Sequence, residues 1–250
     1  MKFLKIKFTE LFKRIINIIN QQKSNQLEKA LIKICKNYEF NKTSEHTIWD
    51  TFHLVKKVFL KNVKGDIVEC GVETGHSLVL FQKIIELFNL ENINIYGYDT
   101  FEGMPKPSDN DKNKYGELLI NQYESRKINK NTSGWNNVSL ETVQSNFFRN
   151  TKLNKNLKLV KGKVEKTLLI EDNLPKRISI LKVDTCLYES TKIVLEILSS
   201  RVQKNGIIII DNYFNYSGIK KATNEYCIKK GYSVKRSLIF GGADRVVIYL

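Results

Sequence analysis

Short apolar stretches alternate with amphipathic ones along most of this chain. The near-continuous apolar runs are DIVECGV, INIYGYD, LKLV, ISILKVD and GIIIIDN, and segments with helical spacing separate most of them. Such runs are typical of strands that are covered on both faces, and their alternation with helices favours a parallel sheet. The pattern therefore predicts an α/β fold with a doubly wound, mostly parallel sheet.

Helical spacing of apolar residues predicts where the covering helices lie. The pattern indicates helices over 77–88, 164–169, 189–199 and 217–229, preceded by one with Ile48, Phe52, Val55 and Phe59 on a single face. The tail, SVKRSLIF and DRVVIYL, predicts two more strands. A chain of 250 residues suffices for one such domain. We therefore expect a helical extension over residues 1–62 and one domain over residues 63–250.

The stretch 104–137 interrupts the alternation. It is polar, contains Pro105 and Pro107, and has no regular pattern of apolar residues. Irregular connections of this length are commonly lids or substrate loops, and disorder is the equally weighted alternative. We expect an insertion here that forms a substrate lid.

The first twenty residues carry a separate amphipathic pattern. A lysine-rich face stands opposite an apolar one, which consists of Phe8, Leu11, Phe12, Ile15, Ile16 and Ile19. The segment lacks the unbroken apolar core of a signal peptide. Two interpretations stay open: a helix that packs on its own domain or on a second copy in a homo-oligomer, and a helix that lies on an anionic membrane surface. The expected location is the cytoplasm, with the inner face of the membrane as the alternative.

Composition narrows the classes of partner. Lys and Arg number 41 against 26 Asp and Glu, which gives a formal net charge of +15. The lysines are spread thinly, without a basic and aromatic stripe, so nucleic acid is not an expected partner. Cys35, Cys70, Cys186 and Cys227 form neither a CxxC pair nor a zinc-ligand spacing, so free thiols are expected.

The turns after the first two predicted strands favour a cofactor, because ligands of doubly wound sheets bind at the carboxyl ends of the strands. VECGVETGHS places Gly71 and Gly75 before a helix, where the backbone can approach a ligand closely. The second strand ends at Asp99, whose carboxylate suits the two hydroxyls of a ribose. Together these residues favour a cofactor that contains adenosine, although a helix cap or a loop carboxylate is the simpler alternative for Asp99.

Two later strands end on carboxylates. Asp184 closes ISILKVD, and Asp211 with Asn212 closes GIIIIDN. Oxygen ligands on adjacent strand ends suit a hard divalent ion such as Mg²⁺, and two carboxylates without an ion would repel each other. The alternative is structural, since Asp and Asn are common in loops.

Five sequence blocks carry a family resemblance. GDIVECGVETGHSLVLF, YGYDTFEGMP, LVKGKVEKTL, ILKVDTCLYESTKIVLEIL and GIIIIDNYFNYSGIKKATNEY resemble successive blocks of the macrocin O-methyltransferase family, whose members are S-adenosylmethionine-dependent sugar O-methyltransferases. The resemblance covers about Lys64 to Tyr226 in order and spacing. It implies a seven-stranded, Rossmann-like methyltransferase sheet with the last strand antiparallel.

The resemblance also implies roles for single residues. The residues expected to bind the methionine end of the cofactor are Glu69, Gly71 and Ser77, with Gly75 in the same turn. The ribose falls to Asp99, with Thr100 beside it, and the adenine edge to Val164 and Glu165. Magnesium falls to Asp184, Asp211 and Asn212. The expected acceptor is a hydroxyl of a small-molecule sugar or a glycan.

Two positions depart from the family pattern. Asn212 stands where the family usually has a second aspartate, which removes a charge but keeps an oxygen ligand. Cys186 stands where the family commonly has an acidic residue, the candidate general base. The proton acceptor is therefore open between Cys186 as thiolate, a histidine such as His76 and a metal-bound water molecule. Two other functions stay open: a non-catalytic S-adenosylmethionine-binding protein, and a membrane-associated modifier of lipid-linked glycans.

Overall fold

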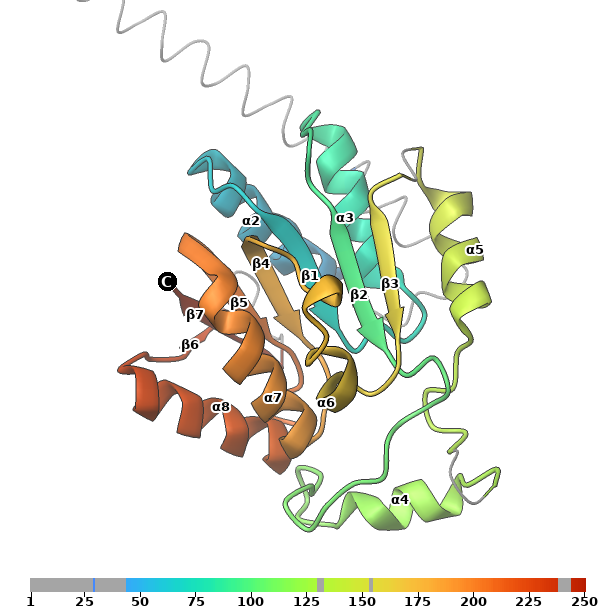
Figure 1. Ribbon diagram of the computed structural model, residues 1–250. Coiled ribbons are helices and arrows are strands. Elements are labelled where there is room, and N and C mark those ends of the chain that lie inside the picture. Colours follow the sequence, from blue (N-terminus) through green and yellow to red (C-terminus); the bar gives the residue numbers. More distant parts are fainter. Residues whose placement is uncertain (1–28, 30–43, 130–132, 153–154, 238–243) are drawn as a thin grey trace, which may run out of the picture. The chain divides into compact units, whose positions relative to one another are not determined.

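The computed structural model describes Lys29 and residues 44–129, 133–152, 155–237 and 244–250 (Figure 1). Residues 46–250 form one compact unit. The amphipathic segment predicted over residues 1–20 lies outside the described residues, and so does the end of the predicted strand SVKRSLIF.

One mixed sheet organises this unit. Its seven strands follow the order β3-β2-β1-β4-β5-β7-β6, with β1 to β5 parallel and β7 antiparallel to both of its neighbours. The strands are β1 (Asp66–Cys70), β2 (Ile95–Asp99), β3 (Leu157–Lys161), β4 (Ile178–Val183), β5 (Val202–Ile210), β6 (Lys235–Arg236) and β7 (Val246–Tyr249). The predicted fold class is confirmed, including the antiparallel last strand.

Helices cover both faces of the sheet (Figure 1). They are α2 (Glu45–Leu60), α3 (His76–Leu87), α4 (Leu119–Ser125), α5 (Leu140–Asn150), α6 (Val164–Thr167), α7 (Tyr188–Leu198) and α8 (Ser217–Lys230), with short 3₁₀ turns at Glu171–Asn173 and Ser199–Arg201. Four helices lie within a residue or two of their predicted bounds. The strand order reverses between β1 and β4, which is where doubly wound sheets bind ligands.

Alternation along the central strands separates an apolar face from a mixed one. Val68 and Cys70 of β1, and Leu181 and Val183 of β4, belong to the buried cluster that also contains residues of α7 and α8. Successive strand residues point to opposite faces of the sheet. Glu69 and Lys182 therefore point to the face opposite α7 and α8. The polar side chains of the central strands therefore gather on one side of the sheet.

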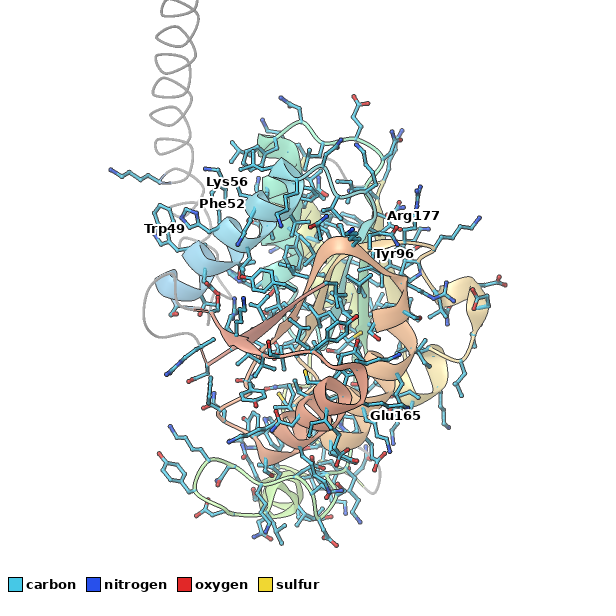
Figure 2. The ribbon with its side chains drawn as sticks, turned by 90° about the vertical axis from the view of Figure 1, so that its left-hand side faces the viewer. Trp49, Phe52, Lys56, Tyr96, Glu165 and Arg177 are labelled. Atoms are coloured by element: carbon cyan, nitrogen blue, oxygen red, sulfur yellow. The ribbon has the colours of Figure 1, made fainter. Side chains whose placement is uncertain are left out.

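Helix α2 belongs to the same compact unit as the sheet. Phe52 is 1% exposed, and its ring stacks 6.1 Å from that of Phe88, the residue that follows α3. Figure 2 shows Phe52 on α2 between Trp49 and Lys56. The sequence analysis places this helix in the N-terminal extension that ends at residue 62. The structure instead divides the chain near residue 45.

Two helices were missed by the sequence analysis. Helix α4 lies inside the polar insertion 104–137, and α5 follows it. Ser139 caps α5, because its hydroxyl accepts a hydrogen bond from the amide of Thr142. The described part of the insertion thus contains one regular element, α4, and its role as a lid stays a prediction. No helix among the described residues is long and apolar enough to cross a membrane.

Gly71 allows β1 and β4 to end close together. Its φ is +88°, and a Cβ added there would lie 2.3 Å from the carbonyl oxygen of Asp184. No side chain fits at this distance. The residue is thus required by the approach of two backbones, independently of any ligand.

Gly71→Ala is expected to lower the free energy of unfolding by roughly 2–5 kcal/mol, from backbone strain plus the clash with Asp184. Gly116→Ala is the matched control, because Gly116 has a similar φ of +86° but nothing within 4 Å of an added Cβ. It should lose only about 1–2 kcal/mol. Denaturant unfolding of both variants measures the difference, and equal losses would contradict the close approach.

Candidate functional site

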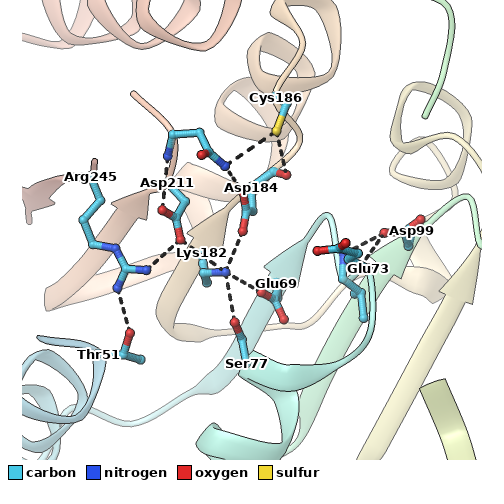
Figure 3. Close-up of polar contacts among 12 residues, drawn as sticks. Thr51, Glu69, Glu73, Ser77, Asp99, Lys182, Asp184, Cys186, Asp211 and Arg245 are labelled. Atoms are coloured by element: carbon cyan, nitrogen blue, oxygen red, sulfur yellow. Dashed lines mark hydrogen bonds and ion pairs between the residues drawn. The ribbon is translucent and has the colours of Figure 1, made fainter. Parts of the chain in front are cut away.

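The carboxyl ends of β1, β4 and β5 bring candidate residues together (Figure 3). The hydrogen-bond ladder continues one step past the strands: the amide of Asp184 donates to Cys70 O at 2.8 Å, and that of Asp211 donates to Val183 O at 2.9 Å. Parallel strands that stop in register place the residues after them along one edge. Asp184 and Asp211 therefore converge, as the sequence predicts.

A buried lysine stands at the centre of this group. Lys182 is 4% exposed. Its Nζ lies 2.7 Å from Glu69 Oε1, 2.8 Å from Asp184 Oδ2 and 3.5 Å from Asp211 Oδ2. It also donates to Ser77 Oγ at 3.0 Å. Burying an unpaired ammonium costs several kcal/mol, so the position of Lys182 depends on these carboxylates.

The same contacts set the charges of the group. Burial disfavours the ammonium form of Lys182, but the carboxylates around it outweigh burial and raise its pKa above the ordinary value. Burial raises the pKa of Glu69 to about 7 and also raises the pKa of Asp184. Burial opposes the charge on Asp211 as well, yet Arg245 and Lys182 prevail and lower its pKa. Lys182 thus stays charged while the carboxylates share it.

A second buried cation links the group to α2. Arg245 directly precedes β7, is 1% exposed, and donates to Asp211 Oδ2 and to Thr51 Oγ1, both at 2.7 Å. It also lies 3.5 Å from Asp50 Oδ2. Sequence reasoning missed Lys182 and Arg245. The available signal was a cation inside or beside an apolar run, ISILKV and RVVIY.

Lys182 and Arg245 contact only one carboxylate oxygen, Oδ2, of Asp184 and Asp211. Lys182 contacts the Oδ2 atoms of Asp184 and Asp211, and Arg245 contacts Asp211 Oδ2. The Oδ1 atoms face Asn212, whose side-chain amide donates to Asp184 Oδ1 at 2.8 Å and whose backbone amide donates to Asp211 Oδ1 at 3.1 Å. The three predicted metal ligands are therefore adjacent, with one oxygen of each carboxylate directed at Asn212.

This oxygen set fits a hard divalent cation. When all are ionised, the four carboxylates and two cations of the group leave a surplus of two negative charges. A turn of the Asn212 amide about its last side-chain bond would direct its oxygen, in place of Nδ2, toward Asp184. No three His, Cys, Asp or Glu side chains in the described part of the chain form a metal-binding group. The predicted set has two aspartates, and its third member is an asparagine, which is not among these four residue types.

Two buried carboxylate oxygens belong to predicted cofactor residues. Glu69 Oε2 and Glu165 Oε2 have no hydrogen-bond partner among the described residues. The other oxygen of Glu69 accepts a hydrogen bond from Lys182. The other oxygen of Glu165 accepts one from the Ser190 hydroxyl at 2.6 Å. Val164, beside Glu165 in α6, is buried in the core. A ligand with N–H donors at both places would satisfy these oxygens.

Asp99 is engaged by the chain itself. Its Oδ2 accepts from the amides of Val72 at 2.7 Å and Glu73 at 3.1 Å, and its Oδ1 accepts from the amide of Phe101 at 3.0 Å. The hydroxyl of Thr100 donates to Gly103 O at 2.6 Å. Asp99 therefore ties the glycine turn, in which Gly75 directly precedes α3, to the end of β2. Its role at a ribose stays a prediction.

The surroundings of Cys186 disfavour the thiolate that a general base would require. Burial, followed by the charges of Asp184 and Asp211, raises the pKa of its thiol well above the ordinary value. Its Sγ lies 3.7 Å from Asp184 O and 3.7 Å from Asn212 Nδ2. These surroundings disfavour the thiolate form, and the role of Cys186 as the base stays a prediction. His76, the other candidate base, is buried at the first position of α3.

Part of the insertion packs against the loops of the site. Leu119 and Tyr123 of α4 form a buried cluster with Trp135 and with Leu187, the residue after Cys186. Tyr216, which follows the loop of Asn212, packs against the same cluster. The predicted lid is thus joined to both loops that carry the aspartates.

Comparisons with known proteins find relatives of this chain. The family model described as Macrocin-O-methyltransferase (TylF) matches residues 17–239. Mycinamicin III 3''-O-methyltransferase from Micromonospora griseorubida is 28% identical over 185 residues, which cover 72% of this chain and 67% of that protein. The 8-demethyl-8-(2,3-dimethoxy-alpha-L-rhamnosyl)-tetracenomycin-C 4'-O-methyltransferase of Streptomyces olivaceus is 28% identical over 193 residues, 76% of this chain and 68% of that protein.

A solved structure shares the fold. The O-methyltransferase NovP matches with a TM-score of 0.67 at 24% sequence identity, and the match covers 81% of this chain and 78% of that chain.

Lys182→Met is expected to destabilise the ligand-free protein by about 3–5 kcal/mol, because it leaves buried carboxylates without their shared cation. Lys158→Met is the control, since Lys158 is exposed on β3 and donates to Tyr96 OH. That change should cost less than about 1 kcal/mol. Chemical denaturation in the presence of a chelator measures both, and a Lys182 variant as stable as the control would refute the central role of the ammonium.

Proposed function

Since this chain belongs to the macrocin O-methyltransferase family and is therefore an S-adenosylmethionine-dependent O-methyltransferase, we propose that it methylates a sugar hydroxyl with the assistance of Mg²⁺. The observation that carries the proposal is the convergence of Asp184, Asp211 and Asn212 beside the buried Glu69. The Streptomyces olivaceus relative is named for a rhamnosyl acceptor. A sugar hydroxyl is the acceptor that we propose.

The proposed cofactor residues surround the glycine turn. S-adenosylmethionine supplies the methyl group on its sulfonium. The two carboxylate oxygens without partners, Glu69 Oε2 and Glu165 Oε2, suit its ammonium group and its adenine amine, respectively. The remaining residues of the proposed set are Gly71, Gly75, Ser77, Asp99, Thr100 and Val164.

Asp184, Asp211 and Asn212 would hold the magnesium ion. Bound there, Mg²⁺ favours deprotonation of the acceptor hydroxyl and supplies a template that orients it. The donor chemistry supports this assignment, because each aspartate offers Oδ1 on the side of Asn212 while Oδ2 is held by a protein cation. The carboxylates are thus fixed before any ligand binds, which limits the reorganisation that transfer requires.

The other residues of the site act by position. Lys182 fixes Glu69 and Asp184 together, and Arg245 fixes Asp211. The side-chain amide of Asn212 donates to Cys186 Sγ at 3.7 Å, so Cys186 would help to orient that amide. The apolar cluster of the insertion would exclude water beside the two loops, which protects the sulfonium from hydrolysis.

One observation favours a second candidate function. Cys186 stands where the family commonly has an acidic residue, and burial raises the pKa of its thiol. A protein that binds S-adenosylmethionine without transferring its methyl group would tolerate this. A role at membrane-bound glycans would depend on residues 1–20, which lie outside the described residues.

Asp184→Asn is expected to weaken Mg²⁺ binding and to slow methyl transfer to a vicinal-diol sugar at least about tenfold, because one charged ligand is lost. S-adenosylhomocysteine affinity should stay within about threefold. Calorimetric titration of the cofactor product, and then of Mg²⁺, separates the two effects. Asp172→Asn, at an exposed carboxylate twelve residues before Asp184, is the control.

The same assays decide between the candidate functions. Transfer that a chelator leaves untouched would contradict the role of the metal. Tight S-adenosylhomocysteine binding without turnover on a broad sugar panel would favour the non-catalytic alternative.

A further inference from the structure

Asp111 is a buried carboxylate that the proposed chemistry does not use. It lies in the polar insertion, yet it is 1% exposed. Its Oδ1 accepts from the backbone amide of Tyr188 at 2.7 Å, and its Oδ2 accepts from the amide and the hydroxyl of Ser108 at 2.8 and 2.7 Å. Asp111 therefore points inward from the polar insertion and binds the start of α7.

The contact with Tyr188 lies at the first position of a helix. Helix α7 starts at Tyr188, directly after the loop that carries Asp184. The free amides and the dipole at a helix N-terminus favour a carboxylate at this place. Asp111 thus holds the insertion to the helix that follows the first aspartate loop.

The same carboxylate touches the start of a second helix. A Cβ added to Gly218, the second residue of α8, would lie 2.0 Å from Asp111 Oδ1. Helix α8 follows the loop that carries Asp211 and Asn212. One side chain of the insertion therefore reaches the first turns of both helices that follow the loops of the site, and only glycine at 218 leaves room for it.

Further hydrogen bonds hold the residues on both sides of Asp111 to α8 and to the start of α4. Ser217 donates through its hydroxyl to Asn110 O at 2.6 Å and through its amide to Lys112 O at 2.8 Å. Lys221 Nζ donates to Asn110 Oδ1 at 2.8 Å. The backbone of Asp111 itself accepts from the amide of Leu119, where α4 begins, at 2.9 Å. The attachment therefore sets the position of α4.

Helix α4 in turn faces the loops of the site. Leu119 and Tyr123 pack with Leu187, which follows Cys186 in the loop after Asp184. In Figure 1, α4 lies beyond the arrowheads of the parallel strands, at the end of the sheet where the site is. The insertion therefore packs against the loop that carries Asp184, at the edge of the sheet where the proposed acceptor would bind.

We propose that Asp111 is a positioning residue for the acceptor, because it fastens the insertion to the N-termini of α7 and α8. This inference rests on the proposed function as far as the acceptor is concerned. Asp111 touches neither the proposed cofactor residues nor the proposed metal ligands. Its loss should therefore change acceptor binding and leave cofactor binding intact.

The test uses two variants on different elements. Asp111→Asn keeps the size of the side chain but loses the charge that the two helix N-termini favour. Gly218→Ala keeps Asp111 but places a methyl group of α8 where the Asp111 carboxylate lies. Both should raise the acceptor KM about tenfold or more with a smaller change in kcat, while the calorimetric affinity for S-adenosylhomocysteine stays within about twofold. Asp109→Asn, at an exposed carboxylate two residues away, should change none of these values.

A second measurement does not need turnover. Limited tryptic cleavage after Lys114, Arg126 or Lys127 should be at least about tenfold faster in both variants than in the wild type, because the insertion detaches. Unchanged cleavage and unchanged KM would overturn the proposal. A loss of S-adenosylhomocysteine affinity equal to the change in KM would also overturn it, since it would mean general destabilisation. If no sugar is methylated by the wild type, the proposed function fails, and the cleavage rates still decide the role of Asp111.

Discussion

The buried ammonium of Lys182 is the interaction on which the rest of the site depends. It contacts carboxylates from β1, from the end of β4 and from the end of β5, and so joins three strands at the edge where ligands bind. Without a shared cation, these carboxylates would repel each other or take up protons. With it, one oxygen of each is fixed, and the remaining oxygens are directed toward Asn212 or left without a partner.

The fold supplies the second constraint, which is the close approach of strand ends. Gly71 admits the backbone of Asp184 at a distance that no side chain would allow, and the ladder continues into both aspartate loops. The chain then starts α7 and α8 directly after these loops. Because Asp111 contacts the first turns of both helices, the insertion is placed relative to the aspartates by the same two elements. Strand register, helix starts and insertion thus form one connected arrangement.

Much of this arrangement can be predicted from the sequence. The apolar runs predict the parallel strands, and the rule that such strands share one carboxyl edge predicts that Asp184 and Asp211 meet. The family resemblance is confirmed by the match over residues 17–239. Lys182 and Arg245 were missed because burial of a cation depends on partners that lie far away in the sequence. Helix α4 was missed because a short polar helix in an insertion has little apolar periodicity of its own.

We propose that the group centred on Lys182 holds both the cofactor site at Glu69 and the metal site at Asp184, Asp211 and Asn212 in place. A crystal structure of the protein with S-adenosylhomocysteine and Mn²⁺, collected at a wavelength where manganese scatters anomalously, tests it most directly. We expect an anomalous peak among Asp184, Asp211 and Asn212, the amino group of the ligand at Glu69, and Lys182 still between the carboxylates. A peak elsewhere, or a ligand whose amino group lies away from Glu69, would contradict it.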